Sequence, residues 1–378
     1  MNLPLSLYFH WPYCASKCTY CAFNKYNIPK GGQDYPRLEN ALITDLKYQL
    51  SLAASNRIHS VYFGGGTPSL ARPELIERIL NLLQIRKGVE VTLEVNPSSS
   101  GLVKLRDFQL AGINRVSIGV QSLHSQVLME MGRDHSVKDA FETIRAAKRF
   151  FDNISLDFIY ARPNQSLSSW EKELHAIIRL EANHLSLYQL MFERGTPLFK
   201  KMAANQIQPL NDEACADIYE KTVELTQAHG YYQYEVSSFA KASCFQSNHN
   251  KAYWQGVDYL GIGPGAHGRF RINNKRNRTF AVLEPNAYMS QCESLGHGIK
   301  KQMEISDTES LKELVVFGLR MMEGVELTKE LIGGILDMSQ VQACVDHDLL
   351  VMNESHLKPT TKGLQVMDAI LSRIFKIN

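Results

Sequence analysis

The sequence predicts an α/β protein, with a partial (β/α)6 barrel of the TIM type followed by a mainly helical C-terminal domain. Short β-rich runs alternate six times with longer amphipathic stretches before residue 236, and the composition changes after Val236. Several of the β-rich runs end in glycine or in polar residues, as strands that carry a ligand site do. Strands separated by helices of this length pair in parallel through right-handed crossovers, and six such units suit a partial barrel.

The six units follow one another along the chain without an internal repeat. Apolar residues at strand or helix spacing predict strands at 5–10, 59–63, 89–95, 115–119, 154–160 and 184–189. The helices between and after them are predicted at 38–53, 73–83, 102–111, 137–151, 170–180 and 212–228. Pro73 suits a first helical turn, whereas Gly112 and Gly230 are typical of residues that end a helix.

The change of composition divides the chain into a core domain at residues 1–236 and a C-terminal domain at residues 237–378. From 237 to 280 the sequence is rich in Gly, Asn and Arg and predicts turns. Ser306 and Glu309 then have the spacing of a capping box ahead of an apolar helix. Helices near 327–336 and 340–348, with a short hairpin at 349–361, have the element order of a winged helix, which is more often structural than DNA-binding in an enzyme tail.

Composition excludes several functional classes. The 41 basic and 39 acidic residues give a net charge of +2, which offers no general surface for polyanions such as nucleic acid. No apolar run reaches the ~18 residues of a membrane helix, so an integral membrane protein is not expected. Because Lys17 is the first basic residue, the basic start of a signal peptide is missing. We expect a reducing, cytoplasmic location, which also suits an odd count of seven cysteines.

Three of the seven cysteines fall within eight residues, as Cys14, Cys18 and Cys21, directly after the first predicted strand. Soft thiolates select zinc or iron–sulfur clusters, and a four-iron cluster held by three cysteines leaves one iron open to another ligand. The alternatives are a zinc site completed by His10, a redox pair of Cys18 and Cys21, and unpaired thiols. The four scattered cysteines are interpreted as packing residues.

The Cys-x3-Cys-x2-Cys motif, with Tyr20 beside its last cysteine, resembles the radical S-adenosylmethionine (SAM) superfamily. Further motifs follow in the order of that superfamily: the glycine-rich segment 64–69 closes the second strand, and polar residues end the third and fourth. The resemblance implies one [4Fe-4S] cluster on the three cysteines, which would cleave SAM to methionine and a 5′-deoxyadenosyl radical. It also implies the SAM-binding residues, which are Tyr8, Tyr20, Gly65, Gly66, Thr67, Glu94, Gln121, Arg133 and Asp157.

The resemblance narrows to the coproporphyrinogen dehydrogenase-like branch and covers nearly the whole chain. Dehydrogenases of this branch carry an extra cysteine two residues after the third and a longer segment ahead of the cluster, whereas this chain has Phe23 there. The HemW haem chaperones instead carry His-Asn-x-x-Tyr-Trp, present here at 249–254, followed by a glycine-rich segment at 261–268. We therefore expect a HemW-like haem chaperone; the alternative is an oxygen-independent coproporphyrinogen III dehydrogenase that converts propionates to vinyls.

The same resemblance implies haem as a ligand, with His249 and Tyr253 as candidate haem-binding residues. Imidazole can ligate iron axially, and Tyr and Trp can flank a porphyrin face. In the alternative interpretation, Tyr253 and Trp254 pack between domains while His249 bonds a turn. The implied partners are haem, haem-accepting proteins such as membrane respiratory proteins, and an electron donor for the cluster. No catalytic residue is expected beyond the cluster and SAM.

Two further patterns are set aside. Gly263-x-Gly265-x-x-Gly268 matches the dinucleotide-binding pattern, but it contains Pro264 and is followed by residues that do not predict a helix. Five basic residues lie between 269 and 278. They are interpreted as part of a solvated hairpin rather than a nucleic-acid patch, with docking of haem propionates or of an acidic partner as a further hypothesis.

Overall fold

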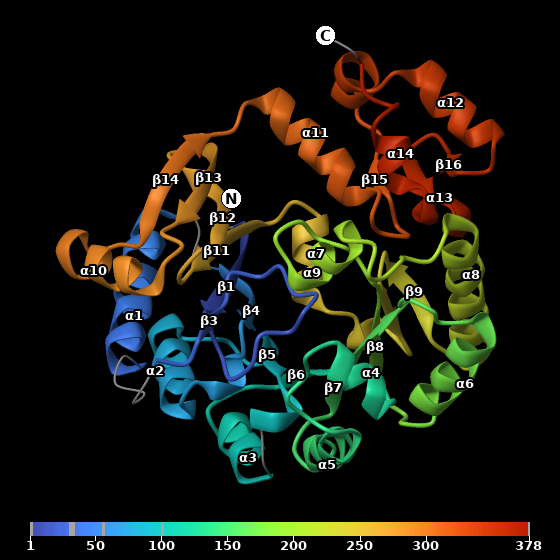
Figure 1. Ribbon diagram of the computed structural model, residues 1–378. Helices are drawn as coiled ribbons and strands as arrows, with labels where there is room; N and C mark the ends of the chain where they lie inside the picture. Colours follow the sequence, from blue (N-terminus) through green and yellow to red (C-terminus); the bar gives the residue numbers. More distant parts are fainter. Residues whose placement is uncertain (1–2, 30–34, 55–56, 100–101, 377–378) are drawn as a thin grey trace.

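A mixed sheet of twelve strands runs through the molecule, in the order β14-β13-β12-β11-β1-β4-β5-β6-β7-β8-β10-β9 (Figure 1). The computed structural model describes residues 3–29, 35–54, 57–99 and 102–376. Six neighbouring strands at its centre are parallel. They are β1 (Pro4–Trp11), β4 (Arg57–Gly65), β5 (Glu90–Val95), β6 (Arg115–Gln121), β7 (Asn153–Tyr160) and β8 (His184–Gln189).

Helices alternate with these strands and cover the convex side of the arc that they form (Figure 1). This arrangement confirms the predicted class of a partial parallel α/β barrel. The helices of this half are α1 (Tyr35–Leu52), α2 (Pro73–Leu83), α3 (Leu102–Leu110), α4 (Ser125–Glu130), α5 (Val137–Ala147), α6 (Leu167–Ile178), α7 (Pro197–Ala203) and α8 (Asp212–Ala228). Short 3-10 turns follow β4 and β5, as η1 (Pro68–Leu70) and η2 (Pro97–Ser99).

Strand periodicity separates an apolar convex face from a polar concave face. On β1 the buried Leu5, Leu7 and Phe9 belong to the main hydrophobic core together with residues of α1 and α2. The alternate residues, among them Ser6 and Tyr8, point to the other side of the sheet, because successive side chains of a strand face opposite ways. The concave face is therefore free to carry polar chemistry.

The sheet continues past residue 236, where turns were predicted, and that prediction of turns is wrong. Two strands extend the β8 edge, β9 (Tyr232–Glu235) and β10 (Ser238–Ala240). After η3 (Ser243–Phe245) and helix α9 (Asn248–Trp254), strand β11 (Asp258–Ile262) pairs in parallel with β1. Antiparallel strands β12 (His267–Ile272), β13 (Lys275–Ala281) and β14 (Ile299–Glu304) complete that edge. Residue 236 thus marks a change of composition inside one continuous sheet.

The basic segment forms the predicted hairpin. Strands β12 and β13 turn at Asn273 and Asn274, whose φ angles of 50° and 62° suit a two-residue hairpin turn. Three of its five basic side chains pair closely with acidic neighbours: Arg269 lies 2.9 Å from Glu313, Arg271 2.8 Å from Asp258, and Lys275 2.9 Å from Glu304. These ion pairs leave little unbalanced positive charge for a nucleic acid.

The rest of the chain is mostly helical. Helix α10 (Pro285–Leu295) packs against α1, and α11 (Asp307–Gly318) begins with the predicted capping box of Ser306 and Glu309. A small sheet in the order β15-β17-β16 follows, formed by β15 (Val325–Glu326), β16 (Leu350–Met352) and β17 (His356–Pro359). It is accompanied by the π-helix η4 (Leu331–Ile335) and by α12 (Met338–Asp346), α13 (Thr361–Gln365) and α14 (Met367–Leu371). In the described part of the chain, no helix is both long and apolar enough to cross a membrane.

Candidate cofactor and ligand site

The loop that carries the clustered cysteines closes on itself directly after β1. Its two ends form a minimal parallel pair, β2 (Tyr13–Cys14) with β3 (Tyr26–Asn27). The glycine-rich turn after β4 lies along this loop, since the Gly66 amide donates to the Trp11 carbonyl at 2.6 Å and the Thr67 amide to that of Tyr13 at 2.9 Å. A β-carbon on Gly66 would come within 3.0 Å of the Cys14 sulfur. Glycine is therefore required for the two segments to approach.

The three clustered cysteines share one electrostatic environment. Burial raises the pKa of the Cys14 thiol, and the neighbouring Cys21 and Cys18 raise it further. Cys18 accepts a hydrogen bond from Arg133 Nη1 at 3.4 Å. No three His, Cys, Asp or Glu side chains within the described ranges are already grouped to hold a metal ion. The structure thus places the three thiols in one loop without fixing their final coordination.

His10, the candidate fourth zinc ligand, has both ring nitrogens occupied. Its Nε2 lies 2.7 Å from the Asn24 carbonyl oxygen, which can only accept, so this nitrogen carries the proton. Its Nδ1 then accepts from the Tyr8 hydroxyl at 3.0 Å. Because both nitrogens are used, the structure disfavours the zinc alternative. All seven cysteines are free thiols.

Arg133 connects the cysteine loop to the ends of two strands. It reaches Cys18 with one nitrogen, and its Nη2 donates to the Asn96 side chain and to the Gly119 carbonyl, each at 2.9 Å. Gln121 is at the end of β6, with a φ of 68°, and its amide nitrogen lies 2.9 Å from where a β-carbon on Gly119 would be. Tyr20 is part of the same group: its pKa is raised by burial, against the opposing effect of Arg133.

Two half-buried carboxyl groups, Glu94 and Asp157, lie on the concave face beside this group. Glu94 accepts from the Tyr62 hydroxyl at 2.9 Å and from the Gly65 amide at 3.2 Å. Burial raises its pKa to about 7, and the charge of Asp157 contributes to the rise. Asp157 accepts from Ser117 at 2.9 Å and from Ser155 at 3.1 Å, and its pKa is also raised by burial. Two acidic groups held in a partly desolvated site suit a cationic ligand group, which would offset the desolvation of their charges.

The structure therefore brings most of the predicted SAM-binding residues to one side of the sheet. Gly65 and Gln121 end their strands, whereas Tyr8 and Asp157 lie nearer the middle of theirs. Asp157 pairs with Gly119 of β6 and Ser186 of β8, so it lies within the sheet rather than at the edge where the strands end. The glycine-rich turn, the three thiols and the half-buried carboxyl groups fit an iron–sulfur cluster with a bound amino acid group.

His249 lies deep in the same face. It is 1% exposed, and its Nδ1 lies 2.9 Å from the hydroxyl of Ser60 on β4. Since that hydroxyl donates to Ser6, it accepts from Nδ1–H. Nε2 therefore accepts from the Tyr253 hydroxyl at 2.9 Å. Burial lowers the pKa of His249 to about 3, so the ring is neutral, and both nitrogens are already bonded.

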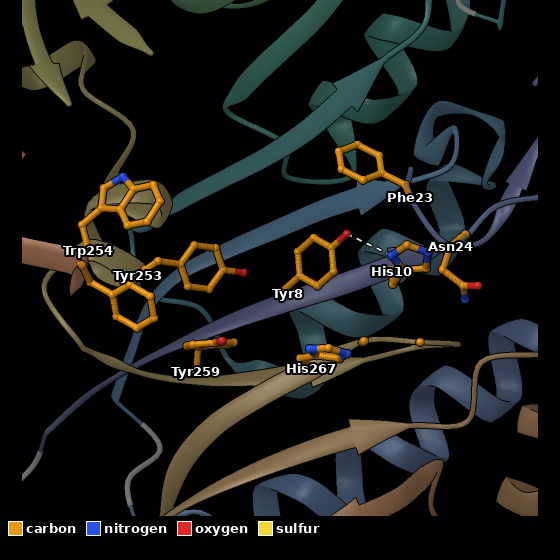
Figure 2. Close-up of a pocket in the computed structure, with 11 residues that line it drawn as sticks. Tyr8, His10, Phe23, Asn24, Tyr253, Trp254, Tyr259 and His267 are labelled. Carbon is orange, nitrogen blue, oxygen red and sulfur yellow. Dashed lines mark hydrogen bonds between the residues drawn. The ribbon is translucent and has the colours of Figure 1, made fainter. Parts of the chain in front are cut away.

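A cavity of about 400 Å³ opens next to the cysteine loop, a size typical of small-molecule sites (Figure 2). Its walls come from β1, the cysteine loop, α9, the segment around β11 and β12, and α11. The lining residues are Tyr8, His10, Phe23, Asn24, Tyr253, Trp254, Tyr259, Gly265, Ala266, His267 and Phe317. Tyr253 and Trp254 were singled out from the sequence, and Phe23 as the position that differs from the dehydrogenases; His249 does not line the cavity.

Asn24 joins two walls of this cavity, and sequence reasoning missed it. Its Nδ2 donates to the carbonyls of Pro264 and Leu283, each at 2.9 Å. A β-carbon on Gly265, whose φ is 76°, would lie 2.5 Å from that nitrogen. This contact explains Gly265 as a close approach, and strand β12, which begins within the segment 261–268 at His267, stands where a dinucleotide site would have a helix. Tyr259, His267 and Phe317 were also missed as lining residues, although His267 lies between the glycines of that segment.

The parallel partial barrel, with a three-cysteine loop after its first strand, defines a radical SAM protein. The model of the radical SAM superfamily matches residues 8–177. The solved structure of coproporphyrinogen III oxidase (HemN) from Escherichia coli, a radical SAM enzyme, covers 98% of this chain and 90% of its own with a TM-score of 0.81. At 21% sequence identity that likeness shows the shared fold.

Two curated relatives place the chain more closely. A radical S-adenosyl methionine domain-containing protein 1, mitochondrial, from Danio rerio is 39% identical, covering 98% of this chain and 86% of the relative. The haem chaperone HemW of Escherichia coli is 35% identical, covering 85% of this chain and 83% of the relative. The chain belongs to the coproporphyrinogen oxidase-like branch of the radical SAM superfamily, near HemW.

Proposed function

We propose that this protein is a haem chaperone that binds haem, one [4Fe-4S] cluster and SAM, and passes haem to haem proteins. The observation that carries the proposal is the aromatic cavity, which joins Phe23 of the cysteine loop to Tyr253 and Trp254 of α9. Flat aromatic side chains around a small cavity suit a flat, largely apolar ligand such as a porphyrin. The name of the Escherichia coli relative, a haem chaperone, supports the same ligand.

Phe23 favours a carrier over a porphyrinogen oxidase. The dehydrogenases of this branch resemble the chain but have a cysteine at this position. Here the side chain is 63% exposed and lines the cavity, so it offers an apolar contact in place of a thiol. The exposed ring is available to a packing partner bound in the cavity. Covering by a porphyrin would supply that partner.

For the cofactors we propose that Cys14, Cys18 and Cys21 hold the cluster, which when bound would supply an open iron for SAM. The Glu94 carboxylate would accept hydrogen bonds from the SAM ammonium, and Gly65 and Gly66 would let the protein backbone approach the carboxylate of SAM. The other proposed contacts with SAM are Tyr8, Tyr20, Thr67, Gln121, Arg133 and Asp157. In the protein itself, Arg133 already links this site to Cys18.

We also propose an electron donor for the cluster, and haem-accepting proteins, among them membrane respiratory proteins, as partners. A cytoplasmic location is proposed from the free thiols, although the Danio rerio relative is named mitochondrial. We propose the division at residue 236 as one of function: the first part holds the cofactor loop and the second adds α9 and β11 to the cavity.

One preparation tests the proposal. The protein is reconstituted anaerobically with iron and sulfide, and haem titration is run in parallel with turnover of coproporphyrinogen III in the presence of SAM and a reductant. A haem chaperone is expected to bind haem stoichiometrically and to leave the porphyrinogen unchanged. Conversion of propionates to vinyls without stable haem binding would instead establish the dehydrogenase.

A further inference from the structure

We propose that His267, and not His249, ligates haem iron in the cavity beside the cysteine loop. This inference rests on the proposed function, because it assigns the ligand within the proposed haem site. His267 begins β12, is exposed and lines the cavity (Figure 2). His249 is buried beneath the cavity wall and has no nitrogen to offer without breaking an existing bond.

The other residues in the cavity with an iron-binding atom are already engaged. The lone pair of His10 Nδ1 accepts from Tyr8, which also occupies the Tyr8 hydroxyl. The Tyr253 hydroxyl bonds to His249, and the Tyr259 hydroxyl accepts from Arg269 Nη1 at 3.0 Å. Burial raises the pKa of Tyr8 and Tyr253 well above the ordinary value, so neither readily becomes the tyrosinate that binds ferric iron.

His267 combines a fixed backbone with a side chain whose nitrogens make no hydrogen bond within the described structure. A β-carbon on Gly261 would meet its carbonyl oxygen at 2.0 Å, and one on Gly268 would come within 2.7 Å of Thr279, so close packing holds this part of β12. The imidazole rests edge-on against Phe280, with ring centroids 4.7 Å apart. Its place on the cavity wall is therefore set by packing alone.

The surroundings of His267 also favour the form of imidazole that binds iron. Partial desolvation of the ring and the nearby Arg269 lower its pKa, which favours the neutral form. In ligation, the lone pair of the neutral ring forms a bond to iron and displaces a solvent ligand, with no change of oxidation state. Figure 2 shows Phe23 across the cavity from His267 and Tyr259, with Trp254 at one end. A porphyrin bound through His267 would thus contact aromatic rings.

The test compares haem binding by three forms of the anaerobically reconstituted, full-length protein. They are the wild type, His267→Ala, and the control His347→Ala, which changes an exposed histidine that does not line the cavity. We expect the wild type and the control to give the same ferric haem spectrum and Kd. The His267→Ala variant should bind haem at least tenfold more weakly and lose the nitrogen-ligated spectrum, and added imidazole should restore that spectrum. Circular dichroism checks that the three folds are equal.

The outcomes separate the inference from the proposed function. If the wild type binds haem and His267→Ala gives the same spectrum and Kd, the assignment of His267 is wrong and the haem chaperone proposal stands. A parallel His249→Gln variant that loses the spectrum while His267→Ala keeps it would return the role to His249. If the wild type binds no haem, the proposed function and this inference both fail.

Discussion

The raised pKa of Glu94 gives a quantitative prediction for SAM binding. A carboxyl with a pKa of about 7 is mostly protonated at pH 6 and mostly ionised at pH 8. The proposed contact with the SAM ammonium needs the ionised form, so the ionised fraction sets the apparent affinity. That fraction changes by about tenfold between pH 6 and pH 8. The Kd of the reconstituted protein for SAM should therefore be about tenfold weaker at pH 6.

The Glu94→Gln variant keeps the size of the side chain and removes its charge. Loss of a hydrogen bond to a charged group costs about 1.5–3 kcal/mol, so SAM should bind about 10- to 150-fold more weakly. The tenfold dependence on pH should also disappear. Isothermal titration calorimetry from pH 6 to pH 8 measures both effects, with Glu142→Gln on the surface of α5 as the matched control. A wild-type Kd that does not change with pH would refute the role of Glu94.

The same group affects stability in the absence of SAM. Because the pKa of Glu94 is raised from 4.5 to about 7, the folded state binds this proton more tightly than the unfolded state. The contribution of Glu94 to the free energy of unfolding is therefore largest below pH 4.5. It decreases by about 3 kcal/mol in total as the pH rises through 7. The difference in unfolding free energy between wild type and Glu94→Gln should change by about this amount between pH 5 and pH 8. If the unfolding free energies of the two proteins changed equally with pH, the raised pKa of Glu94 would be contradicted.

Three further predictions concern the cluster, a buried ion pair and acid stability. Replacing all three clustered cysteines with alanine should remove bound iron, sulfide and visible absorption, whereas wild type should hold about four irons per chain; retained iron would show that other ligands hold it. Arg162→Met should cost about 3 kcal/mol of unfolding free energy in urea, because the buried Glu173 would lose its arginine and keep only the hydrogen bonds from Ser122 and the Leu123 amide, whereas the exposed Lys138→Ala should cost less than about 1 kcal/mol; equal losses would contradict this. Burial lowers the pKa of His249 to about 3, so on acidification the unfolded chain takes up this proton before the folded protein does, and the free energy of unfolding decreases as the pH falls below 6.5. In thermal melts the melting temperature of His249→Gln should fall less between pH 6.5 and pH 4 than that of the wild type; an equal fall would refute this.

The sequence was most informative where structure depends on local pattern. The six parallel strands could be predicted because each is a short apolar run followed by a helix with its own stripe. The capping box at Ser306 and the hairpin after His267 were equally local. Strand β11 was missed because its five residues pair with β1, at the far end of the chain. The spacing of apolar residues within a segment does not show which distant strand it will pair with.

In the candidate site, too, the sequence predicted local features but not contacts between distant segments. The cysteines, the glycine turn and the motif of α9 are adjacent in sequence and could be recognised. The bonds that decide what each side chain can still do were not predictable, because they cross between distant segments. The sequence made His249 a candidate iron ligand, but it did not show that both of its nitrogens are bonded, to Ser60 and to Tyr253. Asn24 looked ordinary, yet it contacts Pro264 and Leu283.

The pairing of β1 with β11 has a consequence for synthesis of the chain. Leu5 of β1 faces Asp258 of β11, so the ribosome makes the two partners roughly 250 residues apart. At a translation rate of about 5–20 residues per second, one edge of β1 remains unpaired for on the order of 10 to 50 s until β11 has been synthesised. The cysteine loop, which follows β1 directly, emerges at the start of that interval. The nascent chain therefore presents its thiols well before the cavity beside them has its remaining walls.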